Sequence, residues 1–315
     1  MTAYLLIAAV LLDGLWGEPR RWHPLVGFGR IAQRIEARLN PQRRGGAMSL
    51  GRIPWGYPLG AAAVLLAVGP PVLAAVLLER YPPLTTPIAV VLLYLAIGHR
   101  SLHEHAIAVE QALQRGDLPE ARRRVGMIVS RDTSDMGPHR IASATVESLL
   151  ENGNDALFGA LFWFLMLGGS GAVAYRLVNT LDAMWGYRTD RYRQFGWAAA
   201  RLDDLLNLLP SRLTALSYAL AGHATVALRC WRRQAVAWES PNAGPVMAAG
   251  AGALGIRVGG GAFYHGRWRE RAMLGAGRTA DVGDIGRARQ LVFRALLLWL
   301  GAVTLCVVSR RLFHA

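Results

Sequence analysis

Three long runs without a charged side chain set the strongest limit on how this chain can fold. They cover Ile53–Leu78, Tyr81–Gly98 and Ala156–Tyr175, which are 26, 18 and 20 residues long. A helix needs about 20 mostly apolar residues to cross a bilayer. Charged residues make up only 18% of the chain, whereas soluble domains carry about 25%. We therefore predict an all-α, polytopic integral membrane protein.

Several of these apolar segments are interrupted. Pro70-Pro71 divides the first run, so a kinked span and a tight hairpin are both open, because proline removes a helical hydrogen bond. Gly168–Gly171 divides the third run into halves too short to span, which favours a re-entrant or protein-buried helical hairpin. Leu213–Leu228 is also short, and a last span is expected at about 290–308. We expect few full crossings, several partial helices, and no strand-like alternation of any length.

The basic residues indicate which loops face the cytoplasm. The net charge is +14, and all 35 basic residues are arginine. Without lysine, a pyridoxal-phosphate Schiff base and a P-loop lysine are excluded. The arginines gather in loops at 20–52, 99–154, 176–201 and 229–289, between apolar runs. This distribution fits the positive-inside rule better than nucleic-acid binding, so we expect these loops in the cytoplasm and no nucleic-acid partner.

Cysteine and histidine offer no metal site by spacing. Cys230 and Cys306 lie far apart in apolar surroundings, and His99 and His103 lie one helical turn apart without further ligands. Met1–Leu12 is apolar but lacks a basic n-region and a cleavage site, so we expect it to be retained.

Two polar groups in the middle of the chain are candidates for a site. Ser130–Asp135 combines Arg131 with two carboxylates, a set that suits phosphate oxygens and Mg²⁺, although Asp or Ser often simply caps a helix. Glu147 and Glu151 share one helical face, and like charges at that spacing favour a bound cation or arginine. A solvated acidic face is the competing interpretation.

Two further groups follow. The third group consists of Asn179, Asp182, Tyr187, Arg188, Arg201, Asp203, Asp204 and Asn207. Carboxylates beside apolar residues at a membrane boundary are costly and therefore favour a functional site, against a merely structural Arg201–Asp204 pair. The fourth group is Ser240–Gly244, leading into the small residues of Gly250–Gly261, where close approach to a ligand and tight helix packing are both open.

Several motifs then occur in the order of a known family. They are Asp13, Gly17-Glu18-Pro19, His23-Pro24, Ser130–Thr133, Val178–Asp182, Phe195–Asp204, Ser240–Gly244 and Gly252–Gly255. In these motifs the chain resembles the adenosylcobinamide-phosphate synthase family (CobD/CbiB) from about residue 10 to 290. The resemblance implies one membrane-embedded domain over 1–315, multi-pass in a bacterial inner membrane. It also implies that the lipid bilayer is a partner. Homo-oligomers and contacts with other late-pathway enzymes are left open.

The resemblance also implies a reaction in cobalamin biosynthesis. ATP would activate a propionate carboxylate of adenosylcobyric acid with the help of Mg²⁺, and the amine of aminopropanol phosphate would attack it. Whether the amine is aminopropanol or ethanolamine phosphate is open. The expected catalytic residues are Asp132, Glu147, Asp182, Asp203 and Asp204. The expected phosphate and substrate ligands are Arg131, Thr133, Asn179, Arg188, Arg201, Asn207 and Asn242. The expected metal ligands are Asp132, Glu147, Glu151 and Asp204.

The sequence departs from the family pattern at four positions. Gly153 stands where the family has threonine, Ala156 where it has glycine, Ala160 where it has proline, and Met247 where it has glutamate. A lost metal-binding glutamate would suit a second interpretation, a non-catalytic membrane paralogue with a scaffold or regulatory role.

Overall fold

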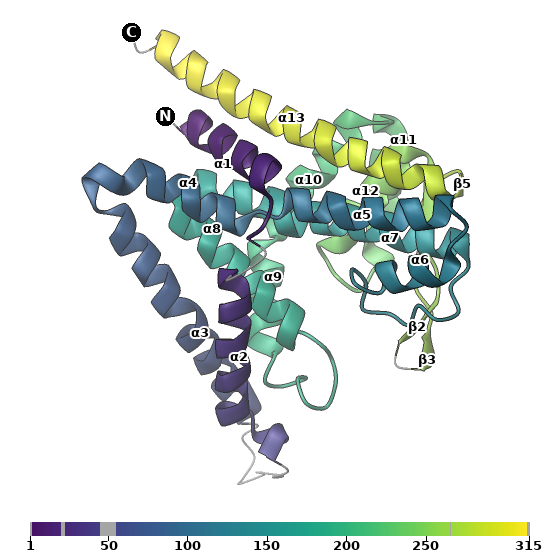
Figure 1. The fold of residues 1–315 in the computed structure, drawn as a ribbon, viewed down its shortest axis with the longest axis horizontal. Coiled ribbons are helices and arrows are strands. Elements are labelled where there is room, and N and C mark those ends of the chain that lie inside the picture. The colour runs from purple at the N-terminus through teal and green to yellow at the C-terminus, as the bar shows by residue number, and fades with distance from the viewer. Residues whose placement is uncertain (1, 20–22, 45–54, 265, 314–315) are drawn as a thin grey trace. The chain divides into compact units, whose positions relative to one another are not determined.

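The computed structural model describes residues 2–19, 23–44, 55–264 and 266–313. Its longer helices are α1 (Thr2–Trp16), α2 (Pro24–Leu39), α3 (Gly56–Glu79), α4 (Thr85–Ala96), α5 (His99–Gln114), α6 (Leu118–Val125), α7 (Pro138–Gly153), α8 (Gly159–Trp185), α9 (Trp197–Leu206), α10 (Leu208–Ala221), α11 (Ala224–Gln234), α12 (Ala243–Leu254) and α13 (Val282–Phe313). The mostly helical class predicted from the sequence is confirmed (Figure 1).

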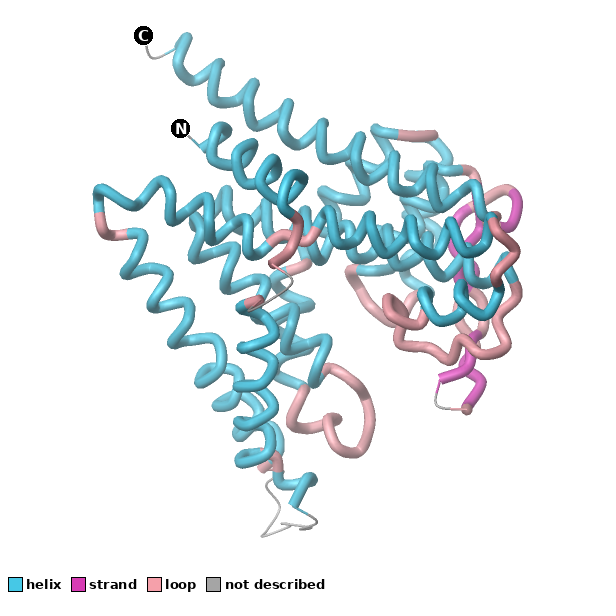
Figure 2. The backbone as a smooth tube through the Cα atoms, viewed as in Figure 1, coloured by secondary structure: helices cyan, strands magenta, loops and turns pink. Residues whose placement is uncertain are grey.

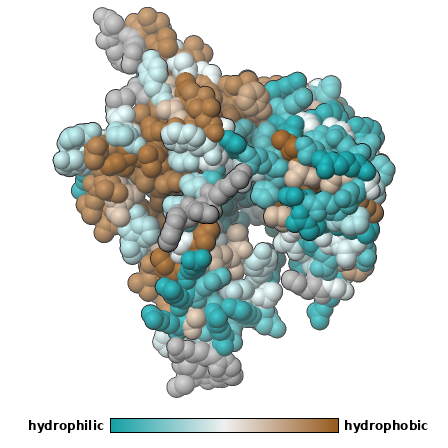
Figure 3. Space-filling view, viewed as in Figure 1, coloured by the Kyte–Doolittle hydropathy of each residue, from teal (hydrophilic) through white to brown (hydrophobic). Residues whose placement is uncertain are grey.

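Four helical stretches are long and apolar enough to cross a membrane. They are Gly56–Glu79, Pro82–Gln114, Pro138–Trp185 and Val282–Arg310. The exposed side chains on α3 include Leu65, Leu66 and Leu73, and Figure 3 shows apolar side chains gathered over this part of the surface. Exposed leucines of this kind suit contact with lipid better than contact with water. The prediction of a polytopic membrane protein is therefore supported.

The chain separates into two compact units, which we describe one at a time. Unit 1 contains Met1–Ala3, Gly98–Phe158 and Leu208–Ala315, and unit 2 contains Tyr4–Ile97 and Gly159–Asn207. Because unit 1 is assembled from segments far apart in sequence, its site cannot be read from one local motif. The same holds for unit 2.

Unit 2 is built on α2, α3, α8 and α9. Its core includes Phe28 of α2, Val64 of α3, Trp185 of α8 and Phe195. Gly60 of α3 lies against the Phe195 carbonyl, and a Cβ there would be 2.0 Å from that oxygen. Only glycine permits this approach, so α3 packs directly on the backbone that leads into α9.

The two interrupted apolar runs fold in different ways. Pro70 and Pro71 lie inside a continuous α3, and the chain reverses after α3, between Arg80 and Leu84. Gly168 has φ of 75° and interrupts α8. A Cβ on Gly171 would be 2.6 Å from the carbonyl oxygen of Trp163, although eight residues of straight helix would rise about 12 Å. The second half of α8 therefore folds back on the first, as the predicted hairpin requires.

Unit 1 surrounds two buried helices, α7 and α12. Residues 141–150 of α7 and all of α12 are buried. A Cβ on Gly250 would lie 2.6 Å from the Leu150 side chain, so the small residues of α12 serve close helix packing. This supports the packing interpretation of the segment that follows Ser240–Gly244.

Unit 1 also contains two small sheets, which the sequence did not indicate because it has no strand-like alternation of any length. The first has the order β4-β1-β5, in which β1 (Ile256–Gly259) pairs antiparallel with β4 (Met273–Gly275) and parallel with β5 (Arg278–Thr279). The second is a hairpin of β2 (Ala262–Tyr264) and β3 (Arg267–Arg269). These strands, magenta in Figure 2, have two to four residues each, too few for alternation to reveal them.

Candidate functional site

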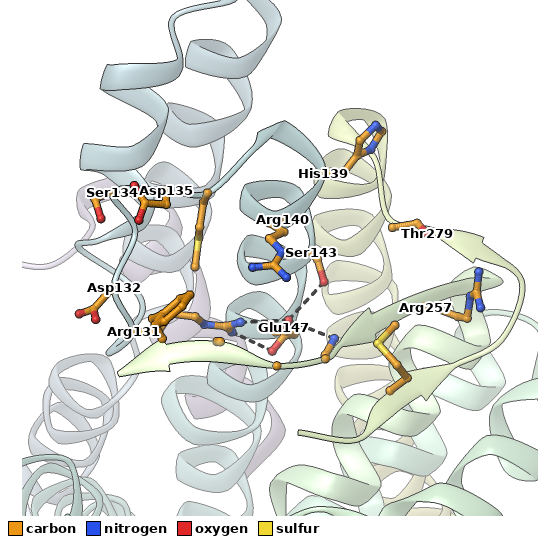
Figure 4. A pocket seen from close by; sticks show the side chains of 17 residues that line it. Arg131, Asp132, Ser134, Asp135, His139, Arg140, Ser143, Glu147, Arg257 and Thr279 are labelled. Carbon is orange, nitrogen blue, oxygen red and sulfur yellow. Dashed lines mark hydrogen bonds and ion pairs between the residues drawn. The ribbon is translucent and has the colours of Figure 1, made fainter. Parts of the chain in front are cut away.

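A pocket of about 250 Å³ in unit 1 lies where α7 begins. One wall comes from the segment 131–136, another from the first turns of α7, and a third from β1 and the loop after it. Figure 4 shows the labelled side chains around this pocket, with Glu147 between the two sides. The pocket thus joins the first two polar groups of the sequence to strands more than 100 residues away.

Glu147 is the most completely bonded carboxylate in this pocket. It is 2% exposed, and its Oε2 accepts from Arg131 at 2.8 Å and from Arg271 at 3.0 Å. Its Oε1 accepts from the Ser143 hydroxyl and from the Gly259 amide, each at 3.2 Å. Both oxygens therefore face donors and cations. This environment fits an arginine anchor, and it does not fit the Mg²⁺ ligand that the sequence predicted.

The two arginines are oriented by that carboxylate. Burial lowers the pKa of Arg131, but pairing with Glu147 more than offsets this effect, so the pKa is raised above its ordinary value. The Arg271 guanidinium stacks on the Trp238 ring at 4.3 Å. Its Nη1 is buried and has no hydrogen-bond partner within the described part of the chain. An unpaired buried N–H is costly, so an acceptor from a ligand would stabilise it.

The glycine run after β1 brings backbone to the pocket. Gly259 and Gly260 have φ of 93° and 81°, values that favour glycine. A Cβ on Gly261 would be 2.1 Å from the Trp268 ring. All three glycines line the pocket together with Arg257. In the sequence this run stands out only as a stretch of small residues, although Arg257 followed closely by three glycines is a signal that could have indicated an anion site.

Of the other predicted site residues in unit 1, one lines the pocket and three do not. Asp132 lines the pocket, and its Oδ2 accepts from the Gly266 amide at 2.8 Å. Thr133 and Glu151 are absent from the pocket lining among the described residues. Asn242 is buried and accepts hydrogen bonds from Ser211 and Arg212. Its contacts therefore join α10 to the start of α12.

A second constellation, which we term the Asp203 network, lies in unit 2. The Asn179 amide donates to Oδ1 of Asp203 at 3.2 Å, and the Asn207 amide donates to Oδ2 at 3.1 Å. Tyr175 donates its hydroxyl to Asn207 at 2.8 Å. Tyr175 and Asn207 are each 1% exposed. Because Tyr175 and Asn207 are buried, they fix the Asn207 amide that donates to Asp203. The orientation of the Asp203 carboxylate is therefore set by packed residues.

Two more carboxylates belong to this network. Asp203 and Asp204 are close enough to Asp182 for their charges to interact. Burial raises the pKa of Asp204, although Arg201 and Arg188 act in the opposite direction. Arg201 pairs with Asp204 at 3.3 Å, with the arginine side chain 60% exposed. The structural pair weighed in the sequence analysis thus exists, but it is too exposed to explain the three carboxylates.

The network includes most of the third polar group, and sequence reasoning missed Tyr175. No periodic pattern singled out this tyrosine, because it ends an apolar run and resembles a core residue. Among the described residues, no three His, Cys, Asp or Glu side chains are arranged to hold a metal ion by themselves. Mg²⁺ commonly binds through one or two carboxylates and completes its shell with water and substrate phosphates. The donor set of Asp203 and its neighbours fits that kind of binding.

Comparisons with known proteins agree with the motifs. The family model described as CobD/Cbib protein matches residues 6–292. A protein from Chromobacterium violaceum called cobalamin biosynthesis protein CobD is 58% identical over 95% of this chain and 94% of its own length. Proteins of the same name from Stutzerimonas stutzeri and Rhodobacter capsulatus are 54% and 38% identical, covering 95% and 93% of this chain and 96% and 94% of their own lengths. No solved structure matches the chain.

Proposed function

Since the chain belongs to the CobD/CbiB family of cobalamin biosynthesis proteins, we propose that it is an adenosylcobinamide-phosphate synthase. In the proposed reaction ATP drives amide formation between adenosylcobyric acid and aminopropanol phosphate. We place the enzyme in the bacterial inner membrane, with its site open to the cytoplasm where ATP is found.

The proposed reaction has two steps, activation of the carboxylate and attack by the amine. A propionate oxygen of adenosylcobyric acid attacks the γ-phosphorus of ATP, ADP leaves, and an acyl phosphate forms. The amine nitrogen then attacks the acyl carbon and the C–O bond to phosphate breaks. The nitrogen must lose protons to a base as the amide forms. The products are adenosylcobinamide phosphate, ADP and inorganic phosphate.

The observation that carries this proposal is the Asp203 network. The amides of Asn179 and Asn207 hold the Asp203 carboxylate in one orientation, and Asp203 and Asp204 both lie close enough to Asp182 for their charges to interact. We assign Asp203 and Asp204 to the binding of ATP phosphates through Mg²⁺, and Asp182, whose charge interacts with theirs, to a catalytic role beside them. When bound, Mg²⁺ would neutralise charge on the transferring phosphoryl group. Asn179 and Asn207 position Asp203.

The arginines of the two units supply further positive charge. In unit 2, Arg188 and Arg201 would contact phosphate oxygens, because arginine offers paired donors to phosphate. In unit 1, Arg131 would contact an anionic group in the pocket. Glu147 positions Arg131 through their ion pair. Asp132, which also lines the pocket, is assigned the role of general base.

Two of the departures from the family pattern, Gly153 and Met247, lie in packed parts of unit 1 outside the pocket. A Cβ on Gly153 would lie 2.3 Å from the Tyr218 hydroxyl, so the tyrosine occupies the space of a larger residue. Met247 is completely buried in α12. Neither residue lines the pocket. These observations favour an enzyme over the scaffold or regulatory paralogue.

Product formation by the purified full-length protein tests the proposal. With Mg²⁺, ATP and both substrates we expect amide, ADP and phosphate in equal amounts. Asp203→Ala and Asp204→Ala should each lower the rate by roughly 100-fold, since each removes a charge held for the transition state. Asp190→Asn, an exposed residue of the loop between α8 and α9, is the matched control. Full activity of both alanine variants would remove the site assignment. Absence of both activity and ATP binding in the parent would favour the paralogue.

A further inference from the structure

One uncharged run of the chain belongs neither to the pocket of unit 1 nor to the Asp203 network. It covers Leu213–Leu228, 16 residues between Arg212 and Arg229, and it is too short to cross a bilayer. In unit 1 it forms the second part of α10 and the first part of α11, with the turn at Gly222-His223. The run is therefore half of a helical hairpin, and its outer surface needs an explanation other than a membrane crossing.

The two helices of this hairpin lie along α12 in opposite directions. Just before α12 begins, the Ser211 hydroxyl of α10 donates to Asn242 at 3.1 Å. Near the same end, a Cβ on Gly244 would lie 2.5 Å from the carbonyl oxygen of Ala235, which follows α11. At the other end, a Cβ on Gly222 would lie 2.8 Å from the carbonyl oxygen of the last-but-one residue of α12. Since α10 and α11 also contact each other, the last turn of α11 lies beside the first turn of α10.

The outer face of α11 is basic. It carries a hollow of about 320 Å³, which is lined by Thr225, Leu228, Arg229, Arg232 and Arg233. All three arginines are exposed. Within the part of the chain that the structure describes, none of them forms an ion pair or a side-chain hydrogen bond. Three positive charges within five residues therefore share one hollow without an acceptor from the protein, and this arrangement suits an anion.

The outer face of α10 is apolar. It presents a stripe of exposed leucines three or four residues apart, which are Leu209, Leu213, Leu216 and Leu220. On another side of the same helix, the Ser217 hydroxyl accepts from the Trp299 indole of α13 at 2.8 Å. Trp299 belongs to Val282–Arg310, one of the stretches that could cross a membrane. Because α10 lies beside this stretch, lipid chains are the natural cover for its leucines.

We propose that the outer faces of α10 and α11 together bind an anionic phospholipid, with its chains on the leucine stripe and its phosphate in the arginine hollow. Arginine is too costly in hydrocarbon, so arginines beside lipid-covered leucines belong at the level of the headgroups. An anionic headgroup fits better than a zwitterionic one, because the latter brings an ammonium group toward three cations. An acidic protein segment would satisfy the arginines but not the leucines. Such a site requires only that the protein lies in a membrane, and it involves no step of the proposed reaction.

Native mass spectrometry of the full-length protein in detergent measures this binding without turnover. The probes are phosphatidylglycerol and phosphatidylcholine with the same acyl chains. The parent should bind phosphatidylglycerol at least about 10-fold more tightly, since each arginine near an anionic lipid contributes about a factor of five. The triple variant Arg229→Gln, Arg232→Gln, Arg233→Gln should lose this preference. The triple variant Arg229→Lys, Arg232→Lys, Arg233→Lys should keep most of it, because an ammonium group also attracts phosphate.

The matched control removes the same charge from another helix. Arg30→Gln, Arg34→Gln, Arg38→Gln changes three exposed arginines of α2 and should leave the preference for phosphatidylglycerol unchanged. An equal loss in this control would show that the lipid responds to total charge, and it would overturn the proposal. A loss in the lysine variant as large as in the glutamine variant would do the same, as would equal affinity of the parent for the two lipids. Displacement of phosphatidylglycerol by excess inorganic phosphate would show a simple phosphate site in place of a lipid site.

Discussion

At the scale of single residues, Glu147 of α7 connects the separate segments that form the walls of the pocket. Its two oxygens accept from two guanidinium groups, one hydroxyl and one backbone amide. A buried charge is tolerated only when it is paired and hydrogen-bonded. Glu147 meets this condition, and the charges of Arg131 and Arg271 are paired as long as the glutamate is charged. The stability of the pocket therefore depends on one negative charge.

Glu147→Gln tests this dependence. The side chain keeps its shape but leaves Arg131 and Arg271 without a counter-charge, so we expect the protein to lose about 3 kcal/mol of stability. Unfolding by heat or denaturant in detergent measures the loss. Glu104→Gln is the matched control, because its pair with Arg100 is exposed on both sides, and such pairs contribute at most about 1 kcal/mol. Equal stability of both variants would contradict the anchor role.

Sequence reasoning found half of this arrangement. The spacing of Glu147 and Glu151 predicted a cation or arginine on that helical face, and Arg131 is that partner. Arg271 lies 124 residues further along the chain, where no periodic pattern connects it to α7. The role of Glu147 as a metal ligand was expected because a sequence shows the carboxylate without its neighbours.

At the scale of elements, helices were predictable and strands were not. The break in α8 followed from glycines in an apolar run, and the Gly168 φ of 75° explains it. The helix after the break begins with a cap that the sequence does not reveal. Glu79 accepts from the Gly169 and Ser170 amides at 2.7 and 3.0 Å, which satisfies free N–H groups and places a negative charge at a helix N-terminus.

The loop between α8 and α9 is held by α2. Glu36 of α2 is 1% exposed and accepts from Arg191 at 3.0 and 2.8 Å, and from Arg43 at 2.6 Å. Asn40 donates to both Glu36 and the Arg191 carbonyl. The same loop carries Arg188, so this clasp helps to place an arginine near the Asp203 network.

The clasp should weaken in acid. Burial acts to raise the pKa of Glu36, but hydrogen bonds from Arg191, Arg43 and Asn40 outweigh it, so the pKa lies below its usual range. A lowered pKa contributes stability that is present above the unfolded pKa, about 4.3, and is lost as pH falls through the folded pKa. At neutral pH the contribution is complete.

Glu36→Gln should therefore remove at neutral pH the stabilisation of the loop that protonation of Glu36 removes from the parent in acid. We expect faster amide hydrogen exchange over residues 186–196 and a raised KM for ATP, with the rest of unit 2 unchanged. The same variant should show little further loosening as pH falls below about 4.3, whereas the parent loosens as pH falls from there through the lowered pKa of Glu36. Unchanged exchange in this loop would show that packing, and not the carboxylate, holds it.

At the scale of the whole molecule, the chain combines two separately assembled units with four stretches that could cross a bilayer. The motifs of the first polar groups fall in unit 1 and those of the third in unit 2. Which segments belong to each unit is decided by packing between parts of the chain that are far apart in sequence. The sequence therefore indicated the polar residues but not which of them lie in the same unit. The class of the protein was accessible because bilayer thickness fixes the length of an apolar helix.

The last prediction concerns which side of the membrane the polar parts face. The arginine-rich segments 99–154 and 229–289 both belong to unit 1, and the positive-inside rule places both in the cytoplasm. Asp132 and Asn242 represent the two segments, but Asn242 is buried and would report poorly. Single cysteines at the exposed positions Arg115 and Glu239, in a chain with Cys230→Ala and Cys306→Ser, are better reporters.

A membrane-impermeant thiol reagent should label neither position in intact spheroplasts and both in inverted vesicles, with the cysteine-free chain unlabelled throughout. Labelling of the two positions from opposite sides would contradict a single cytoplasmic unit 1. It would also separate Asp132 from the glycine run after β1, and the pocket that they share could not form.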